Sequence, residues 1–412
     1  MKAIMVVADG MADRPLPDLH WKTPLEAANT ENMDWLAAHG VCGIIDPVSP
    51  GFPPGSDTAN LALLGYDPME VYRGRGALEA LGAGLELKRW DVAFRCNFAT
   101  VDENMVVVDR RAGRICTEHA SKLAESLQGI RSQRYPDVQV IFKNTREHRA
   151  VLVLRGPGLS TAVTDVDPGA TGLPVRRAKP VKPTLGAKTA AVVNELVEKF
   201  HEVLSHHPIN EERAKTGLLP ANVVILRGAG APPELTPITS KYGIKAAAIS
   251  AIPLVRGVAR AAGMQLIDVP GATGSYDTDL EAKAEAALNA LKENDLVLLH
   301  VKATDIASHD KKLDKKMEMI ERIDAMLKRI IEGANTEETY IIVTCDHTTS
   351  ILTGKHEGDP VPVVIYGPMV RTDDVKEFGE RTCAKGGLCR IRGVELMPIV
   401  MNLMGKVKKF GA

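Results

Sequence analysis

The chain has 412 residues, 45% hydrophobic and 25% charged, and its 51 basic and 52 acidic side chains leave a formal net charge of −1. This composition is typical of a globular protein with two or three domains, and the absence of a basic stripe argues against nucleic acid as a partner. The chain has only seven Phe, seven Tyr and three Trp, so platforms for stacking bases are not expected either.

The N-terminal apolar run, residues 1–8, ends at Asp9 and is too short for the apolar region of a signal peptide. No stretch has the length needed to span a bilayer. We therefore expect a cytoplasmic protein without a membrane partner, as a monomer or a small homo-oligomer. The six cysteines are expected to be reduced thiols, although the spacing of Cys383 and Cys389 would also allow a disulfide that closes one loop.

Residues 3–8 form a short continuous apolar run, and similar runs follow at 295–301, 340–344 and 363–366. Such runs are typical of strands that are buried on both faces of a parallel sheet. Between them, residues 311–332 carry the apolar stripe of an amphipathic helix. Strands alternating with helices predict an α/β fold with a doubly wound, mostly parallel sheet.

The middle of the chain has a different pattern, with alternating rather than continuous apolar strands and one long helical stripe at 187–204. We interpret this part as a separate α+β domain inserted into the sheet domain. The predicted boundaries give a core of residues 1–80 and 245–412 and an inserted domain of residues 81–244.

Two polar residues lie at predicted ends of elements. Asp9 directly follows the first strand, where ligands of open α/β sheets bind, so its carboxylate could hold a metal; taken alone, a structural turn is the more common role. Ser56 follows a loop rich in Pro and Gly and begins a helical pattern. It could be a helix cap, or a nucleophile that a divalent cation activates as an alkoxide.

Three further groups follow predicted strands: Asp305 with His309, Asp346 with His347, and His356. In a helix, Asp305 and His309 would share one face and suit Mn²⁺ or Zn²⁺. Asp346 and His347 can act together only if the chain turns there, because neighbours in a strand point to opposite faces. Three Asp and three His at one sheet edge, together with one serine, match a pair of metal ions bridged by a phosphoryl group under attack.

The order of these motifs resembles the alkaline phosphatase superfamily, and within it the cofactor-independent phosphoglycerate mutases. The phrases VADGMADRP, GSDTANLALLGYDP, FRCNFATV, VPGATGSYDTD and CDHTT resemble the archaeal type, and the similarity runs through nearly the whole chain. The resemblance implies an alkaline-phosphatase-like core with an inserted lid. It also implies the interconversion of 2-phosphoglycerate and 3-phosphoglycerate in glycolysis and gluconeogenesis, through a phosphoserine at Ser56 and without 2,3-bisphosphoglycerate.

The same resemblance implies two metal sites, one held by Asp9, Ser56, Asp346 and His347 and the other by Asp305, His309 and His356. We expect Mn²⁺ in both, with Zn²⁺, Co²⁺ or Mg²⁺ as alternatives.

A mutase must keep water off its phosphoserine, and the inserted domain would supply the lid. Arginine side chains suit the carboxylate and the phosphate of the substrate. The candidates are Arg149, Arg227 and Arg256, with Asp165 or Asp167 as a general acid or base.

Two other readings stay open at this stage. A phosphatase or phosphodiesterase of the same superfamily would share the metal ligands. Phosphopentomutase is a further member of this superfamily to consider. A sulfatase would need a Cys/Ser-x-Pro-x-Arg phrase, which the loop around Ser56 lacks. A metal-binding protein without catalysis would have no use for a serine beside a full set of ligands.

Overall fold

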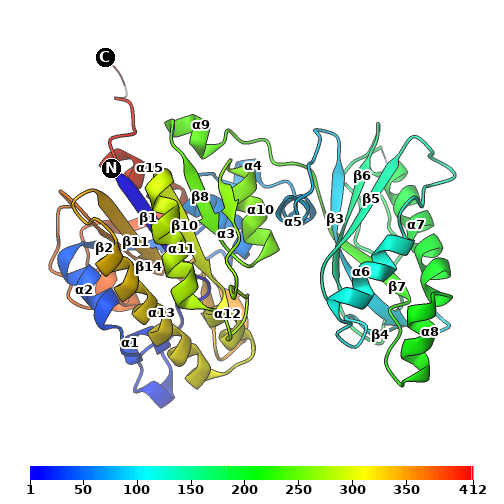
Figure 1. Cartoon of the computed structure of the whole chain (residues 1–412), viewed down its shortest axis with the longest axis horizontal. Helices are drawn as coiled ribbons and strands as arrows, with labels where there is room; N and C mark the ends of the chain where they lie inside the picture. The colour runs from blue at the N-terminus through cyan, green and yellow to red at the C-terminus, as the bar shows by residue number, and fades with distance from the viewer. Residues whose placement is uncertain (183, 410, 412) are drawn as a thin grey trace. The chain divides into compact units, whose positions relative to one another are not determined.

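The computed structural model describes residues 1–182, 184–409 and 411, and the chain forms two compact units (Figure 1). Unit 1 comprises Met1–Tyr72 and Glu234–Ala412, and unit 2 comprises Arg73–Pro233. The core is therefore built from both ends of the chain.

The boundaries differ from the predicted ones because two short helices belong to the other unit. Helix α5 (Arg75–Gly82) packs Ala77 and Ala80 against strands of unit 2 rather than against the core. Helix α9 (Ile238–Tyr242) belongs to unit 1, where the Ile238 N–H donates to the carbonyl of Ala262. Both helices are short, so the apolar pattern in their sequences does not reveal which of the two sheets they pack against.

Unit 1 contains an eight-stranded sheet in which β14 alone runs against the other strands. In spatial order the strands are β15 (Cys389–Arg392), β2 (Val41–Asp46), β14 (Val361–Tyr366), β11 (Thr339–Thr344), β1 (Lys2–Ala8), β10 (Leu296–Val301), β8 (Ala246–Ile249) and β9 (Gln265–Ile267). Every residue of β10 and β11 is buried, which explains their continuous apolar sequences. The predicted fold class, a doubly wound and mostly parallel sheet, is confirmed.

Helices cover both faces of this sheet. The chain goes from β8 through α10 (Pro253–Ala261) out to the edge strand β9, and returns through α11 (Leu280–Glu293) to β10. Because parallel crossovers are right-handed, outward and returning connections lie on opposite faces. Helices α2, α11 and α13 form one layer, and α3, α10 and α15 the other.

Besides α9, α10 and α11, unit 1 has the 3₁₀ turn η1 (Pro17–Leu19) and helices α1 (Pro24–Ala27), α2 (Glu31–His39), α3 (Ser56–Leu63), α4 (Pro68–Val71), α12 (Ala303–His309), α13 (Leu313–Gly333), α14 (Glu380–Cys383) and α15 (Gly393–Leu403). A small hairpin of β12 (Thr348–Ser350) and β13 (Lys355–Glu357) completes the unit. Of the apolar residues of the predicted stripe, helix α13 buries Ile320 and Leu327, whereas Leu313, Met317 and Ile331 are only half-buried.

Unit 2 is an antiparallel sheet with a large apolar core on one face. Its strands are β3 (Val92–Val101), β4 (Val107–Asp109), β5 (Gln139–Arg146), β6 (Arg149–Arg155) and β7 (Val223–Gly230), and its other helices are α6 (Thr117–Ser126), α7 (Ala187–Ser205) and α8 (Pro208–Lys215). Phe98, Phe142 and Phe200 pack edge to face in that core. Helix α5 covers part of the opposite face.

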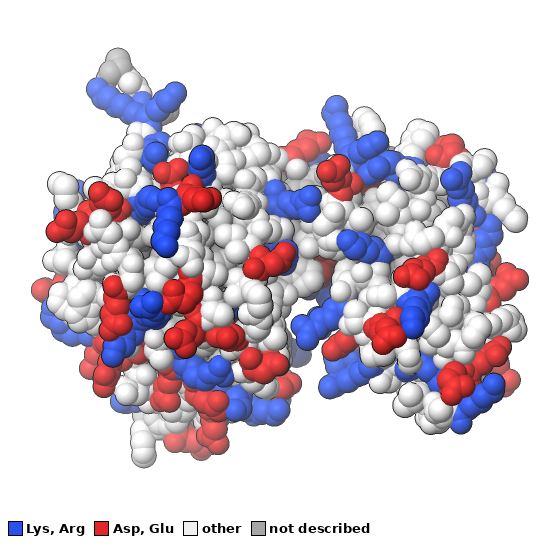
Figure 2. Space-filling view, viewed as in Figure 1, with Lys and Arg blue, Asp and Glu red and all other residues white. Residues whose placement is uncertain are grey.

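The surface and the cysteines agree with the composition. Figure 2 shows basic and acidic side chains interspersed over the face in view, without a basic stripe. Cys383 is buried, Cys389 is exposed and both are free thiols. Within the described part of the chain, no helix has the length and apolarity needed to cross a membrane.

Candidate active site

Three adjacent parallel strands carry an aspartate each to one edge of the main sheet. In the spatial order β11-β1-β10, Asp346 comes just beyond β11, Asp9 directly follows β1, and Asp305 lies in α12, which begins just after β10. All three side chains are almost completely buried. The carboxyl ends of parallel strands are where α/β sheets place ligands, so this edge is the candidate site.

Gly10 allows the three segments to approach one another. Its φ of +65° lies in the left-handed region, and a Cβ there would come within 2.6 Å of Thr349 Oγ1 and 2.8 Å of Asp305 Cβ. Its N–H donates to Asp346 Oδ1 at 3.1 Å. A larger residue at this position would therefore push Asp305 and Thr349 away from the end of β1.

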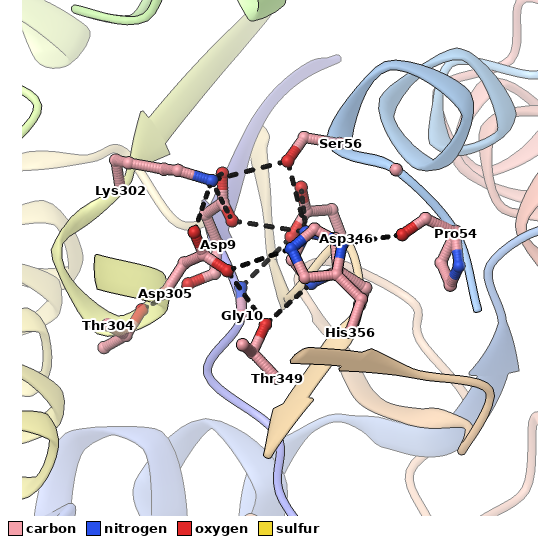
Figure 3. Close-up of polar contacts among 12 residues, drawn as sticks. Asp9, Gly10, Pro54, Ser56, Lys302, Thr304, Asp305, Asp346, Thr349 and His356 are labelled. Atoms are coloured by element: carbon pink, nitrogen blue, oxygen red, sulfur yellow. Dashed lines mark hydrogen bonds and ion pairs between the residues drawn. The ribbon is translucent and has the colours of Figure 1, made fainter. Parts of the chain in front are cut away.

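Ser56 begins helix α3 and points at this group of side chains (Figure 3). Its Oγ lies 3.2 Å from His347 Nε2 and 3.4 Å from Lys302 Nζ. The side chain of Asn60, one turn later, donates to the Ser56 carbonyl at 2.8 Å and to Asp346 Oδ2 at 3.0 Å. Asn60 thereby holds the start of helix α3 against Asp346. Ser56 does not cap this helix, so its hydroxyl is free to face the cluster.

Three histidines aim their Nε2 atoms inward because each Nδ1 is held from behind. The Nδ1 atoms of His309 and His356 lie 2.7 Å from the carbonyl oxygens of Gly354 and Pro54, and His347 Nδ1 lies 3.0 Å from Thr349 Oγ1. A carbonyl only accepts hydrogen bonds, so in His309 and His356 Nδ1 carries the proton and Nε2 of the neutral ring has a free lone pair. This is the arrangement that metal-binding histidines adopt.

The inward atoms form a donor set that fits divalent cations. Asp305 contacts both His309 and His356, each at 3.3 Å, and the two Nε2 atoms of these histidines are themselves 3.3 Å apart. Lone pairs of neutral imidazoles repel at that distance unless a cation or a proton lies between them. Ligand atoms within 4.8 Å of one another come from three triads: Asp305, His309 and His356; Asp9, Asp305 and His347; and Asp9, His300 and Asp346.

Lys302 supplies the positive charge at the centre of the group. Its Nζ lies 2.9 Å from both carboxylate oxygens of Asp9 and 2.7 Å from Asp305 Oδ2 (Figure 3). Burial alone would lower the pKa of Lys302, but the surrounding carboxylates raise it, so the ammonium stays charged. Lys302 Nζ thus contacts Ser56 Oγ and, at the same time, the carboxylates of Asp9 and Asp305.

Burial and this ammonium move the other pKa values in opposite directions. Burial raises the pKa of Asp346 well above its ordinary value, with Asp9 adding repulsion. For Asp9 and Asp305, burial acts in the same direction, but Lys302 and the contacting histidines together outweigh it, so their pKa values lie below the ordinary range. Burial lowers the pKa of His347 to about 3, which keeps this ring neutral. A neutral imidazole beside ionised carboxylates is what cation binding requires.

The residues predicted to bind the substrate are not part of this cluster of aspartates and histidines. In unit 2, Arg110 holds Asp167 with two hydrogen bonds, of 3.1 and 2.6 Å, and Arg227 lies 3.5 Å from the same carboxylate. Arg149 is exposed on β6. In unit 1, Arg256 forms an ion pair of 2.8 Å with Asp268.

Comparison with known proteins gives a consistent result. The family model of 2,3-bisphosphoglycerate-independent phosphoglycerate mutase matches residues 37–210. The mutase named "2,3-bisphosphoglycerate-independent phosphoglycerate mutase 1" of Methanothermobacter thermautotrophicus is 47% identical over 414 residues, and the match covers 100% of both chains. Its namesake in Methanocaldococcus jannaschii is 48% identical, covering 100% of this chain and 99% of the relative. The chain belongs to the 2,3-bisphosphoglycerate-independent phosphoglycerate mutase family.

Two solved structures agree with this membership. A protein of Pyrococcus horikoshii is 41% identical with a TM-score of 0.87, covering 100% of this chain and 99% of that one. The cofactor-independent phosphoglycerate mutase of Thermoplasma acidophilum is 38% identical with a TM-score of 0.72, covering 98% and 100%. The predicted membership in the archaeal-type phosphoglycerate mutases is confirmed, and with it the enzyme class, an isomerase.

The structure brings together all seven side chains that the sequence selected for the metal sites of a phosphoglycerate mutase. They are Asp9, Ser56, Asp305, His309, Asp346, His347 and His356. The sequence prediction did not include Lys302, His300 or Thr349. Lys302 precedes Asp305 by three residues, and i,i+3 spacing in a helix is a signal that could have revealed it. His300 contacts Asp9 at 2.9 Å from within β10, where nothing in the sequence distinguishes it from a core residue.

Proposed function

We propose that this chain interconverts 2-phosphoglycerate and 3-phosphoglycerate through a phosphoserine at Ser56, beside two divalent cations. The reaction needs no 2,3-bisphosphoglycerate and would serve glycolysis and gluconeogenesis in the cytoplasm. One observation carries the proposal: the Ser56 hydroxyl opens onto a buried set of carboxylates and imidazoles and contacts His347 and Lys302.

The donor geometry supports a division of the ligands into two sites. Asp305, His309 and His356 would hold one cation, since their ligand atoms already converge. Asp9, Ser56, Asp346 and His347 would hold the other. Oxygen and imidazole ligands together suit Mn²⁺, with Zn²⁺, Co²⁺ and Mg²⁺ as alternatives. When bound, the cations would lower the pKa of the serine hydroxyl and neutralise the phosphoryl oxygens.

The residues of the chain have distinct tasks in the transfer. Ser56 Oγ gives up its proton and forms a bond to phosphorus while the bond from phosphorus to the substrate oxygen breaks, and the substrate oxygen takes up one proton in turn. Lys302 lies beside Ser56 Oγ and stabilises the negative charge of the group in transfer. In the second half of the reaction the other hydroxyl of glycerate attacks the phosphoserine, and Ser56 is regenerated.

Unit 2 offers a basic surface that suits the anionic groups of the substrate. Arg95 on β3 pairs in register with Arg227 on β7, and Arg149 lies opposite Asn97, two residues along β3. Alternate residues of a strand share a face, so these arginines lie on the face of the sheet away from its main core. We assign carboxylate and phosphate binding to this face.

Two buried polar atoms on the same part of unit 2 support that assignment. Asn97 Oδ1 and His148 Nδ1 are buried and lack a hydrogen-bond partner within the described chain. Burial and the neighbouring Arg149 lower the pKa of His148 to about 4, so its ring is neutral and can bond to an anionic or hydroxyl-bearing ligand. Burial alone would raise the pKa of Asp167, but its bonds to Arg110 lower it. This carboxylate thus stays ionised and orients Arg110 and Arg227.

The decisive experiment separates a mutase from a phosphatase. The purified chain is incubated with 3-phosphoglycerate and Mn²⁺, without 2,3-bisphosphoglycerate, and both 2-phosphoglycerate and free phosphate are measured. We expect 2-phosphoglycerate to accumulate to equilibrium with little free phosphate. Release of phosphate as the main product would contradict the proposal. A parallel incubation with a pentose phosphate tests the substrate class.

A further inference from the structure

Thr349 lies at the centre of strand β12 with its hydroxyl between residues of the two proposed cation sites. Thr349 Oγ1 is 3.0 Å from His347 Nδ1 and 2.9 Å from Asp305 Oδ1, and the side chain is fully buried. Figure 3 shows Thr349 beneath the cluster, with its bonds pointing into it. In the proposed assignment, Asp305 belongs to one cation site and His347 to the other.

The number of protons on these groups fixes the direction of both hydrogen bonds. A hydroxyl has one proton, and an ionised carboxylate can only accept, so Thr349 donates to Asp305. Because its one proton is then used, the Thr349 oxygen can only accept from His347, which requires the proton on Nδ1. His347 Nε2 is therefore left with a free lone pair, and that atom faces Ser56 Oγ at 3.2 Å and Asp9 Oδ1 at 3.4 Å.

The backbone of Thr349 is held on both sides, so this hydroxyl has a fixed position. The Thr349 N–H donates to the carbonyl of Ala12 at 3.1 Å, and the Thr349 carbonyl accepts from Lys316 Nζ at 2.9 Å. Lys316 forms an ion pair of 2.8 Å with Asp13, and both of these side chains are completely buried. Thr349 also pairs in register with His356 across the hairpin. Such a frame lets one side chain orient several ligands.

We propose that Thr349 is a positioning residue that couples the two cation sites: its single hydroxyl fixes the tautomer of His347 and the orientation of Asp305 together. The inference rests on the two-cation site of the proposed function. It goes beyond that function because it assigns a role to a side chain that is not among the proposed metal ligands and contacts two of them. Loss of this hydroxyl should weaken both sites at once.

Three variants distinguish the hydroxyl from the bulk of the side chain. Thr349→Val replaces the hydroxyl with a methyl group of similar size, and Thr349→Ser keeps the hydroxyl while removing the methyl group. Thr348→Val is the matched control, because Thr348 is equally buried in the same strand but bonds to the carbonyl of Asp359 at 3.3 Å. Thermal unfolding of each variant in the presence of a chelator shows whether the metal-free fold is retained.

The measurement is a calorimetric titration of the metal-free protein with Mn²⁺, which reports the number of ions bound and their affinities. For Thr349→Val we expect both affinities to fall by about 10–100-fold, the usual effect of removing a group that orients a metal ligand. Thr349→Ser should stay close to the parent protein, and Thr348→Val should match it. Nitrogen NMR of the metal-free parent, labelled at histidine, should show the His347 proton on Nδ1, and Thr349→Val should lose this preference.

Contrary results distinguish a failure of the coupling role of Thr349 from a failure of the two-cation site. Parental affinities in Thr349→Val, weakening of only one ion, or an equal loss in Thr349→Ser would overturn the coupling role of the hydroxyl. A His347 proton on Nε2 in the parent would overturn it too. A parent protein that binds no Mn²⁺ would instead overturn the two-cation site itself, and the inference with it.

Discussion

Replacing Lys302 by methionine removes the positive charge beside Ser56 with little change in side-chain length. In the structure Lys302 Nζ lies 3.4 Å from Ser56 Oγ and 2.9 Å from each oxygen of Asp9. The variant should therefore lose transition-state stabilisation while it keeps all the proposed metal ligands. Catalysis is expected to fall without a loss of cation binding.

The size of the effect follows from the distance. At 3.4 Å, two unit charges interact by about 5 kcal/mol at an effective dielectric constant of ~20. The group in transfer carries only part of a unit charge at the oxygen nearest Lys302, so this value is an upper bound. Loss of one preorganised donor at a developing anion typically lowers kcat by about 10²–10³-fold. We expect a decrease in that range for Lys302→Met.

Mn²⁺ binding should be as tight as in the parent, or tighter. Lys302 compensates part of the negative charge of Asp9 and Asp305, and its removal leaves that charge available to a cation. Steady-state kinetics at saturating Mn²⁺ and a Mn²⁺ titration measure the two quantities on one preparation. Lys315→Met, at a partly exposed lysine paired with Glu318, is the control. A kcat of Lys302→Met within a factor of about ten of the parent would refute the reasoning, because the charge would then not act on the transition state.

Three other predictions concern the nucleophile, the metals and the protonation of the ligands. Ser56→Ala should show no detectable turnover with an unchanged thermal unfolding curve, and mass spectrometry after rapid quenching should find a phosphoserine in the parent but not in the variant. A chelator should abolish activity and added Mn²⁺ should restore it; full activity in the metal-free protein would contradict the two-cation proposal. Mn²⁺ affinity should begin to fall at a pH above the ordinary histidine pKa of about 6.5 and should fall further as the pH is lowered. The hydrogen bond to Asp305 raises the pKa of His309 above its ordinary value, so the ring takes up a proton that the cation must displace. His347, with its pKa lowered to about 3 by burial, should not contribute to this decrease; a flat affinity profile down to pH 5 would argue against His309 as a ligand.

The sequence alone determined the class of the fold and seven of the side chains that gather at its edge. Strands such as β10 and β11 are buried on both faces, so their sequences are continuously apolar, and such runs are recognisable without coordinates. A polar residue just after such a strand lies at the edge of the sheet, whichever strands are its neighbours. The positions of Asp9 and Asp346 could therefore be predicted without coordinates. The spacing of Asp305 and His309 likewise follows from helix geometry alone.

Only the tertiary structure decided which neighbours surround these groups. Lys302 and Thr349 act through contacts with residues far away in the chain, and a lysine or threonine next to a motif looks the same in the sequence whether it faces the cluster or the solvent. The unit boundaries depended in the same way on which sheet the short helix α5 covers. Local patterns record burial and period, whereas the pairing of buried charges such as Lys316 with Asp13 is set by how distant segments meet in the folded chain.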